Sequence, residues 1–106
     1  MGNDLSYPAK ERRLDIQVNV YLEGKVKSLG SEFEGRRFTA GIMLPGRYTF
    51  KTDSEETITV TVGGLEVKLP DNKGKKVSQG ETIVIPPGVE FGLAVEKTCS
   101  YICFYK

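Results

Sequence analysis

The dominant pattern along this chain is a two-residue alternation of apolar and polar side chains, broken about every eight to twelve residues by Gly or Pro. The clearest stretch is residues 14–22, where the apolar side chains occupy every even position from Leu14 to Leu22. Such alternation predicts β-strands with one covered face, and no stretch keeps a helical period for long. The pattern therefore predicts an all-β protein.

Further strands are expected at regular intervals along the rest of the chain. In residues 57–62 hydroxyl and aliphatic side chains alternate, so one face of that strand is wet or lines a polar cavity. Pro45-Gly46 and Gly63-Gly64 are predicted to form turns. The other predicted strands cover residues 38–44, 47–52, 65–69, 82–85, 91–95 and 100–105. This spacing is typical of a sandwich or barrel that is closed or nearly closed.

Length and composition fit one globular domain. The 106 residues are 39% hydrophobic and 27% charged, which is ordinary for a globular protein. We expect residues 1–13 to be a flexible N-terminal segment and residues 14–106 to form the domain. Fifteen basic and fourteen acidic residues give a net charge of +1, so no overall field attracts nucleic acid or an anionic membrane. Neither is an expected partner.

The two cysteines and the absence of histidine limit which disulfides, catalytic groups and metal sites the chain can form. Cys99 and Cys103 lie four residues apart in one predicted strand. Their Cα atoms are then ~13 Å apart, too far for a disulfide. Unpaired cysteines, and an N-terminus with no apolar signal-peptide core, predict a cytoplasmic protein. The chain has no His, which excludes His-based catalytic triads and His-ligated metals.

One short motif carries a family resemblance. Gly80, Pro86 and Gly88 form the pattern G-x5-P-x-G, which describes a turn, a buried strand and a type II turn with Gly88 at positive φ. This spacing resembles the second motif of the cupin superfamily, in which a metal-binding His stands where this chain has Phe91. Thr52 and Ser54 stand in place of the His ligands of the first cupin motif. The resemblance implies a cupin-type jelly-roll β-barrel without the metal centre.

A narrower resemblance covers the chain from Tyr21 onward. Its pieces are Gly24 to Ser28, Gly41-Ile42-Met43, Gly46, Tyr48 to Phe50, Thr52, Glu55-Glu56, Val60, Gly63, Leu65, Val67, Leu69-Pro70, Gly80, Pro86, Glu90-Phe91, Ser100-Tyr101, Cys103 and Tyr105. In this order and spacing they are similar to the cupin-fold pyrimidine/purine nucleoside phosphorylases. The resemblance implies cleavage of purine and pyrimidine nucleosides by phosphate, giving free base and ribose 1-phosphate. It implies no cofactor, with phosphate as co-substrate.

Two departures from the family pattern are visible. The chain carries about a dozen additional N-terminal residues, and Phe104 stands where the family is expected to have a basic residue.

Phosphorolysis requires a clamp for phosphate, for which the planar fork of Arg is preferred. Arg37 is the first candidate because it matches the Arg that the family places ahead of Gly41-Ile42-Met43. The alternatives are Arg36, Arg47, Lys25 and Lys27.

The sugar and the base require other groups. Glu56, which matches the family pattern, is the candidate carboxylate for the ribose hydroxyls, and Thr52 can add a hydroxyl contact. Broad specificity favours stacking of the base on an aromatic ring over a fixed hydrogen-bond pattern. Phe91 is the first candidate for this role, because it replaces an inward-pointing ligand. The other aromatic candidates are Tyr48, Phe50 and Tyr101.

Two function classes remain open at this point. One is the nucleoside phosphorylase, and the other is a non-catalytic cupin module that binds a sugar or nucleoside. A metal-dependent dioxygenase or isomerase is disfavoured because the ligand residues are missing. The discriminating observation is whether uridine releases uracil only when phosphate is present.

The apolar face of residues 14–22 also predicts an assembly. Leu14, Ile16, Val18, Val20 and Leu22 share one face that must be covered, and the strand should pair with a sheet edge. A homodimer, with this strand added to the partner's sheet, is the predicted assembly.

Overall fold

The computed structural model describes residues 15–71 and 73–106. The segment 1–13 that was expected to be flexible, and Leu14, lie outside the described residues. A short 3-10 turn, η2 (Leu22–Gly24), is the sole helical element of the described chain, so the all-β prediction is confirmed. The strands are β1 (Gln17–Tyr21), β2 (Val26–Phe33), β3 (Arg36–Met43), β4 (Gly46–Lys51), β5 (Glu56–Val62), β6 (Gly64–Lys68), β7 (Gly74–Ser78), β8 (Thr82–Ile85), β9 (Glu90–Val95) and β10 (Cys99–Tyr105).

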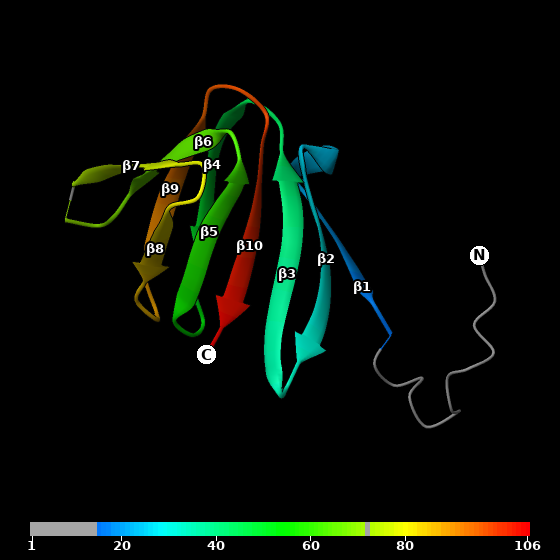
Figure 1. The fold of residues 1–106 in the computed structure, drawn as a ribbon. Helices are drawn as coiled ribbons and strands as arrows, with labels where there is room; N and C mark the ends of the chain where they lie inside the picture. The colour runs from blue at the N-terminus through cyan, green and yellow to red at the C-terminus, as the bar shows by residue number, and fades with distance from the viewer. Residues whose placement is uncertain (1–14, 72) are drawn as a thin grey trace.

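The strands form two antiparallel sheets that face each other (Figure 1). The larger sheet has six strands in the order β1-β2-β3-β10-β5-β8, and the smaller has four in the order β4-β9-β6-β7. The C-terminal strand β10 lies in the middle of the larger sheet, between β3 and β5. The chain therefore crosses repeatedly between the sheets, as expected for a jelly roll.

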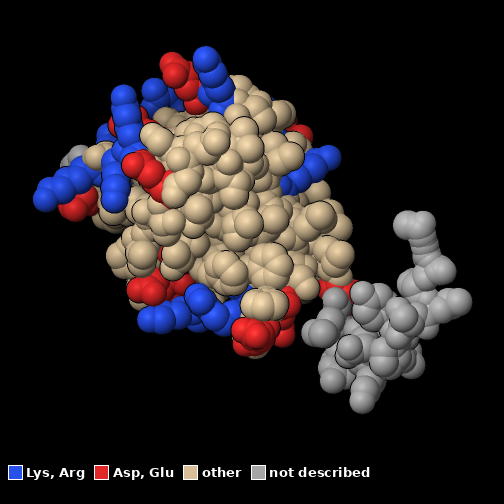
Figure 2. All heavy atoms as spheres, viewed as in Figure 1, with Lys and Arg blue, Asp and Glu red and all other residues tan. Residues whose placement is uncertain are grey.

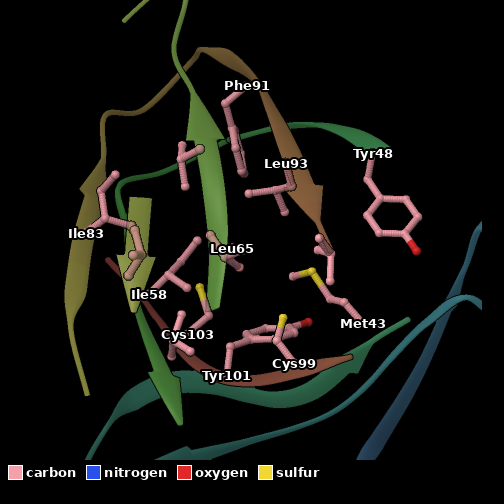
Figure 3. Packing of buried hydrophobic residues seen from close by; sticks show 14 of the residues in the cluster. Met43, Tyr48, Ile58, Leu65, Ile83, Phe91, Leu93, Cys99, Tyr101 and Cys103 are labelled. Atoms are coloured by element: carbon pink, nitrogen blue, oxygen red, sulfur yellow. The ribbon is translucent and has the colours of Figure 1, made fainter. Parts of the chain in front are cut away.

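The core lies between the two sheets, where their inward side chains meet (Figure 3). Alternation places Ile58 and Val60 of β5 inward, and Thr57 and Thr59 on the other face. Val60, Val67 and Ile85 are among the fully buried side chains. The apolar positions of strands such as β5 and β9 form the core, as the period of two predicts. The apolar face predicted over residues 14–22 is not covered by the described chain, because Ile16, Val18 and Val20 are exposed.

The sequence pattern missed two strands and overextended another. Neither β2 nor β7 was predicted. The strand predicted over residues 14–22 ends at Tyr21, because Leu22 and Glu23 take positive φ values of 52° and 58° and begin the 3-10 turn. β1 pairs antiparallel with β2 of its own chain, so the predicted edge pairing is present within one molecule.

The loop between β8 and β9 has the conformation that the motif predicts. Gly88 has a φ of +72°, as a glycine in a type II turn requires. Thr52 fastens this loop: its Oγ1 donates to the carbonyl of Pro86 at 2.7 Å, and the backbone N–H of Val89 donates to Oγ1 at 3.0 Å.

Cys99 and Cys103 are both free and buried on β10, as their spacing predicts. The described residues include no helix of the length and apolarity needed to cross a bilayer.

Candidate functional site

A cavity of about 290 Å³ lies between the two sheets at one side of the core. Its wall comes from β1, β2, β3, β5 and β10 of the larger sheet and from β4 and β9 of the smaller sheet. The volume is close to the lower end of the range for small-molecule sites. Five of the seven predicted site residues line it, namely Arg37, Phe50, Glu56, Phe91 and Tyr101.

Small side chains on the inner face of β2 and β3 leave room for the cavity. The inward positions of β2 hold Val26, Ser28 and Gly30, and those of β3 include Thr39 and Gly41. Larger side chains at these positions would occupy the space between the sheets. The same choice of residues hides β2 from sequence analysis, because its inward face is not apolar.

Aromatic rings form one wall of the cavity. Phe50 lies against Phe91 with ring centroids 6.2 Å apart, and the ring of Tyr21 meets Phe50 edge-on at 5.7 Å. Phe91 is only 4% exposed, so its ring belongs to the core as well as to the cavity wall. Phe50 and Tyr21 are more accessible, and Tyr21 was not predicted as a site residue. The sequence feature that could have identified Tyr21 is its place at the end of the alternating strand, on the inward side.

Arg37 is held at the cavity by an aromatic ring. Its guanidinium lies 5.2 Å from the centroid of the Tyr105 ring, and the Tyr105 hydroxyl shares a hydrogen bond of 3.0 Å with Thr39. A cation over an aromatic face is attracted by the ring quadrupole. Arg36 points to the opposite face of β3, where its guanidinium lies over Phe104. The structure therefore separates these two neighbouring candidates.

Lys51 is a second cation at the cavity that sequence analysis missed. It ends β4, directly after Phe50 and before the polar loop that leads to Glu56. The sequence feature that could have identified Lys51 is its place between Phe50 and Thr52, two predicted site residues. Arg47, one of the earlier alternatives, does not line this cavity, nor do Lys25 and Lys27.

Glu56 begins β5 and lies half-buried in the cavity wall, where Cys103 Sγ donates to its Oε1 at 3.5 Å. Burial raises the pKa of Glu56, the hydrogen bond from Cys103 lowers it, and the nearby Asp53 carboxylate raises it. The net result is a pKa above the ordinary value of a glutamate. Burial, with the Glu56 charge beside it, also raises the pKa of Cys103 to about 12, so the thiol keeps its proton.

The adjacent Glu55 is not part of this site. Its carboxylate forms an ion pair with Lys106 at 3.4 Å. Asp53 is instead the second carboxylate that lines the cavity.

Tyr101 contributes a buried phenol to the inner wall. Burial raises its pKa to about 12, so it remains a neutral hydroxyl. It can donate or accept a hydrogen bond toward a ligand without changing charge.

Tyr48 and Thr52, the other two predicted site residues, lie outside the cavity. The Tyr48 hydroxyl donates to the carbonyl of Leu44 at 2.5 Å, which fastens the turn between β3 and β4. The Thr52 hydroxyl is fully used by the loop between β8 and β9. Both side chains are buried and engaged with backbone, so their partners are the protein itself.

Two of the residues at the cupin ligand positions do not fit a metal ion. Thr52 is bound to backbone, and Phe91 is an apolar ring packed on Phe50. Across residues 15–71 and 73–106, no three side chains of His, Cys, Asp or Glu gather into a group that could hold a metal ion.

The cavity combines features that suit a polar ligand with a flat ring. Arg37 and Lys51 supply positive charge for an anion, while Asp53 and Glu56 supply acceptors for hydroxyl groups. Phe50, Tyr21 and Phe91 supply aromatic surface. The fold is that of a small cupin-type protein, and a solved structure shares this fold. The ethanolamine-utilisation protein EutQ of Clostridium difficile superposes with a TM-score of 0.68 at 20% identity, covering 76% of this chain and 66% of that one.

The family is narrower than the fold class. The family model described as pyrimidine/purine nucleoside phosphorylase matches residues 16–105, and the chain belongs to this family. A relative from Magnetococcus marinus with that name is 42% identical over 91 residues, covering 85% of this chain and 98% of the relative. One from Pectobacterium carotovorum is 44% identical over 92 residues, with the same coverage. A Vibrio parahaemolyticus protein of unknown function superposes with a TM-score of 0.84 at 38% identity, covering 87% of this chain and 99% of that one.

Proposed function

We propose that the protein is a nucleoside phosphorylase that cleaves purine and pyrimidine nucleosides with inorganic phosphate. Membership of the family supports this activity. The observation that carries the proposal is the single cavity in which Arg37 and Lys51 lie with Glu56 and an aromatic wall. Those groups match the three parts of the substrates: phosphate, ribose and base.

In the proposed reaction a phosphate oxygen forms a bond to C1′ of the ribose as the bond from C1′ to the base nitrogen breaks. The electron pair of the broken bond goes to the base, which takes up the proton that the attacking hydrogen phosphate releases and leaves as the free base. The sugar carries positive charge in the transition state, when the bond to the base is largely broken and the bond to phosphate is not yet complete. Positioning and electrostatic stabilisation supply most of the acceleration in such a reaction, and no covalent intermediate is needed.

Each side chain has a role in this proposal. Arg37 binds phosphate through its planar fork, and Lys51 adds a second positive charge. Glu56 accepts hydrogen bonds from the ribose hydroxyls, and its carboxylate stabilises the positive charge that develops on the sugar. Phe50 and Tyr21 provide the surface for the base, because stacking tolerates purines and pyrimidines alike. This reaction would class the protein as a pentosyltransferase.

Three further expectations belong to the same proposal. The reaction needs no metal ion, because phosphate, ribose and base each have a partner among protein side chains. The enzyme works in the cytoplasm, which suits two unpaired buried cysteines. It acts as a homodimer, because Val18 and Val20 of β1 are left exposed by the part of the chain that the structure describes.

The test is to incubate the purified protein with uridine, inosine or adenosine, with and without millimolar phosphate, and to measure free base by chromatography. Base released only with phosphate, and unchanged by EDTA, is the expected result. If all three nucleosides stay intact, the enzyme proposal fails. Binding of nucleoside by calorimetry in that case would identify the protein as the non-catalytic binding module.

A further inference from the structure

Three polar side chains lie in one row across the inner face of the six-stranded sheet. Asn19 on β1 is opposite Ser28 on β2. Ser28 is in turn opposite Gly41 on β3, and Gly41 is opposite Tyr101 on β10. Asn19, Ser28 and Tyr101 all line the cavity, and we call these three residues the polar row. The polar row therefore brings an amide, an aliphatic hydroxyl and a phenol to one part of the cavity wall.

Inward polar groups on β1 and β2 reverse the usual arrangement of a sheet. On the outer side the same strands carry the exposed apolar side chains Val18 and Leu29. Figure 2 shows that side as a broad uncharged surface, with the Lys, Arg, Asp and Glu side chains gathered at its margins. On the inner side Ser28 is only 4% exposed, and Asn19 is half-buried. Because polar groups are costly to bury without hydrogen bonds, this arrangement indicates that the wall contacts a polar ligand.

Hydrogen bonds within the polar row orient the Asn19 amide. Its Nδ2 donates to Ser28 Oγ at 3.1 Å. Burial raises the pKa of Tyr101 to about 12, and a hydrogen bond with Ser28 acts against that rise, so the Ser28 hydroxyl joins the amide to the phenol. Among the hydrogen bonds of the described residues, none engages the second Nδ2 proton or the Oδ1 of Asn19. The amide therefore offers the cavity one donor and one acceptor side by side.

The polar row lies toward the aromatic end of the cavity, away from Arg37. Tyr21 follows Asn19 by two residues on the same face of β1, and its ring meets Phe50 edge-on. Arg37 stands four residues before Gly41 on β3, which is ~13 Å along the strand. A nucleoside with its phosphate partner at Arg37 and its base on Phe50 and Tyr21 would therefore bring the far edge of the base to Asn19.

We propose that Asn19 is a specificity-determining residue that pairs with the exocyclic oxygen or amino group of the base. This inference rests on the proposed function, because it requires a nucleobase in the cavity. A keto group, as in uridine or inosine, accepts from the Asn19 Nδ2, and an amino group, as in cytidine or adenosine, donates to Oδ1. One side chain thus serves both kinds of base, and its hydrogen bond to Ser28 holds it in the plane that this pairing needs.

Asn19→Asp tests this role, because it replaces the N–H donor by a second acceptor at nearly the same size. Keto bases lose their partner, whereas amino bases keep theirs. The kcat/KM ratios of uridine to cytidine and of inosine to adenosine should therefore each fall at least ~10-fold. Gln17→Glu is the matched control: it makes the same chemical change two residues earlier on β1, at a side chain that does not line the cavity. Its ratios should equal those of the wild type.

A second variant covers the case in which Asn19→Asp does not fold. Asn19→Ala should raise the KM of inosine and adenosine ~10-fold, because each loses one hydrogen bond to the amide. It should leave the KM of purine riboside nearly unchanged, because that nucleoside has no exocyclic group to lose a partner. A change that affected only packing would act on all three substrates alike.

Unchanged ratios in folded Asn19→Asp overturn the inference, and so does an equal loss for all four nucleosides or an equal shift in Gln17→Glu. Calorimetry with the same four nucleosides measures the affinity ratios without catalysis. Affinity ratios that shift in Asn19→Asp, in a protein that cleaves none of the nucleosides, would overturn only the proposed function. Cleavage of all four by wild type and Asn19→Asp at the same ratios would overturn only the role of Asn19.

Discussion

The ring of Tyr101 lies directly over Gly41, its opposite residue on the neighbouring strand β3. A Cβ added at residue 41 would be 2.5 Å from the Tyr101 hydroxyl oxygen and 2.6 Å from its Cζ. The glycine therefore lets the phenol lie flat against the sheet at the inner wall of the cavity. Without it, the ring must move toward the space between the sheets.

Gly41→Ala should destabilise the protein by ~1–3 kcal/mol, as overpacking does, and should raise the nucleoside KM by narrowing the cavity. Gly30→Ala is the control on the adjacent strand, because its Cβ would meet Thr39 at an ordinary 3.5 Å. That variant should be neutral or slightly stabilising, since alanine has a less disordered unfolded state. Urea denaturation and steady-state kinetics measure both effects. Equal stability of the two variants would contradict the close packing of Tyr101.

Glu56→Gln should lower kcat by about 10²–10³-fold with a smaller change in KM, because the lost charge acts mainly as positive charge develops on the sugar. Glu55→Gln provides the control, since Glu55 pairs with Lys106 outside the cavity. Initial rates with uridine and inosine check this prediction. Near wild-type activity in folded Glu56→Gln would move the role to Asp53, the other carboxylate of the cavity.

Arg37→Ala should raise the phosphate KM at least ~10-fold and leave the nucleoside KM nearly unchanged, because the anion loses a two-point partner. Lys51→Ala should act in the same direction with a smaller effect. Arg47→Ala, which removes an arginine outside the cavity, should have the kinetics of the wild type. A phosphate KM that rises equally in the Arg47 and Arg37 variants would show that only overall charge matters.

Stability should depend on pH through Glu56. Its pKa is raised in the folded protein above the ordinary value of 4.5, chiefly by burial. A raised carboxyl pKa contributes stability at low pH, and that contribution is lost as the pH rises through the folded-state pKa. The melting temperature of Glu56→Gln should therefore exceed that of the wild type by a few degrees at pH 8. The difference should shrink below about pH 4, where both states of the wild type are protonated.

The two cysteines should resist thiol reagents in the folded protein. Burial raises the pKa of Cys103 to about 12 and also raises that of Cys99. At pH 8 only about one Cys103 thiol in ten thousand is the reactive thiolate. Labelling should therefore require unfolding in guanidinium, after which both thiols react. Rapid labelling of one thiol in the native protein, monitored by absorbance, would show that β10 opens locally.

The sequence predicts this fold wherever one face of a strand is apolar and the other is polar. β5 and β9 follow that rule, and their predicted bounds are within a residue of the observed ones. β2 breaks the rule, because its inner face carries Ser28, which lines the cavity, and Gly30, while Leu29 points outward. The small residues of its buried side and the exposed Leu29 on its other side do not give the usual pattern of an apolar buried face and a polar exposed face. The sequence pattern therefore does not identify β2 as a strand.

The sequence predicts those site residues that match the family pattern and whose place in a strand turns their side chains inward. Arg37 and Glu56 match the family pattern and line one cavity. Thr52 and Tyr48 match it as well, but hydrogen bonds to backbone engage their hydroxyls, and a sequence does not display such bonds. Lys51 and Asp53 enter the cavity from the two sides of a turn, which depends on the direction of the chain after β4.

The hydrogen bonds that Thr52 makes to the loop between β8 and β9 make a cupin-type metal centre hard to acquire by single substitutions. Thr52→His would supply one imidazole but would remove the hydroxyl that joins Pro86 and Val89. Phe91→His would open a gap in the core beside Phe50 before any ligand set was complete. Each of these substitutions lowers the stability of the fold, and metal binding becomes possible only when all the ligands are present. Selection acting on single substitutions would therefore keep this lineage on chemistry performed by its own side chains.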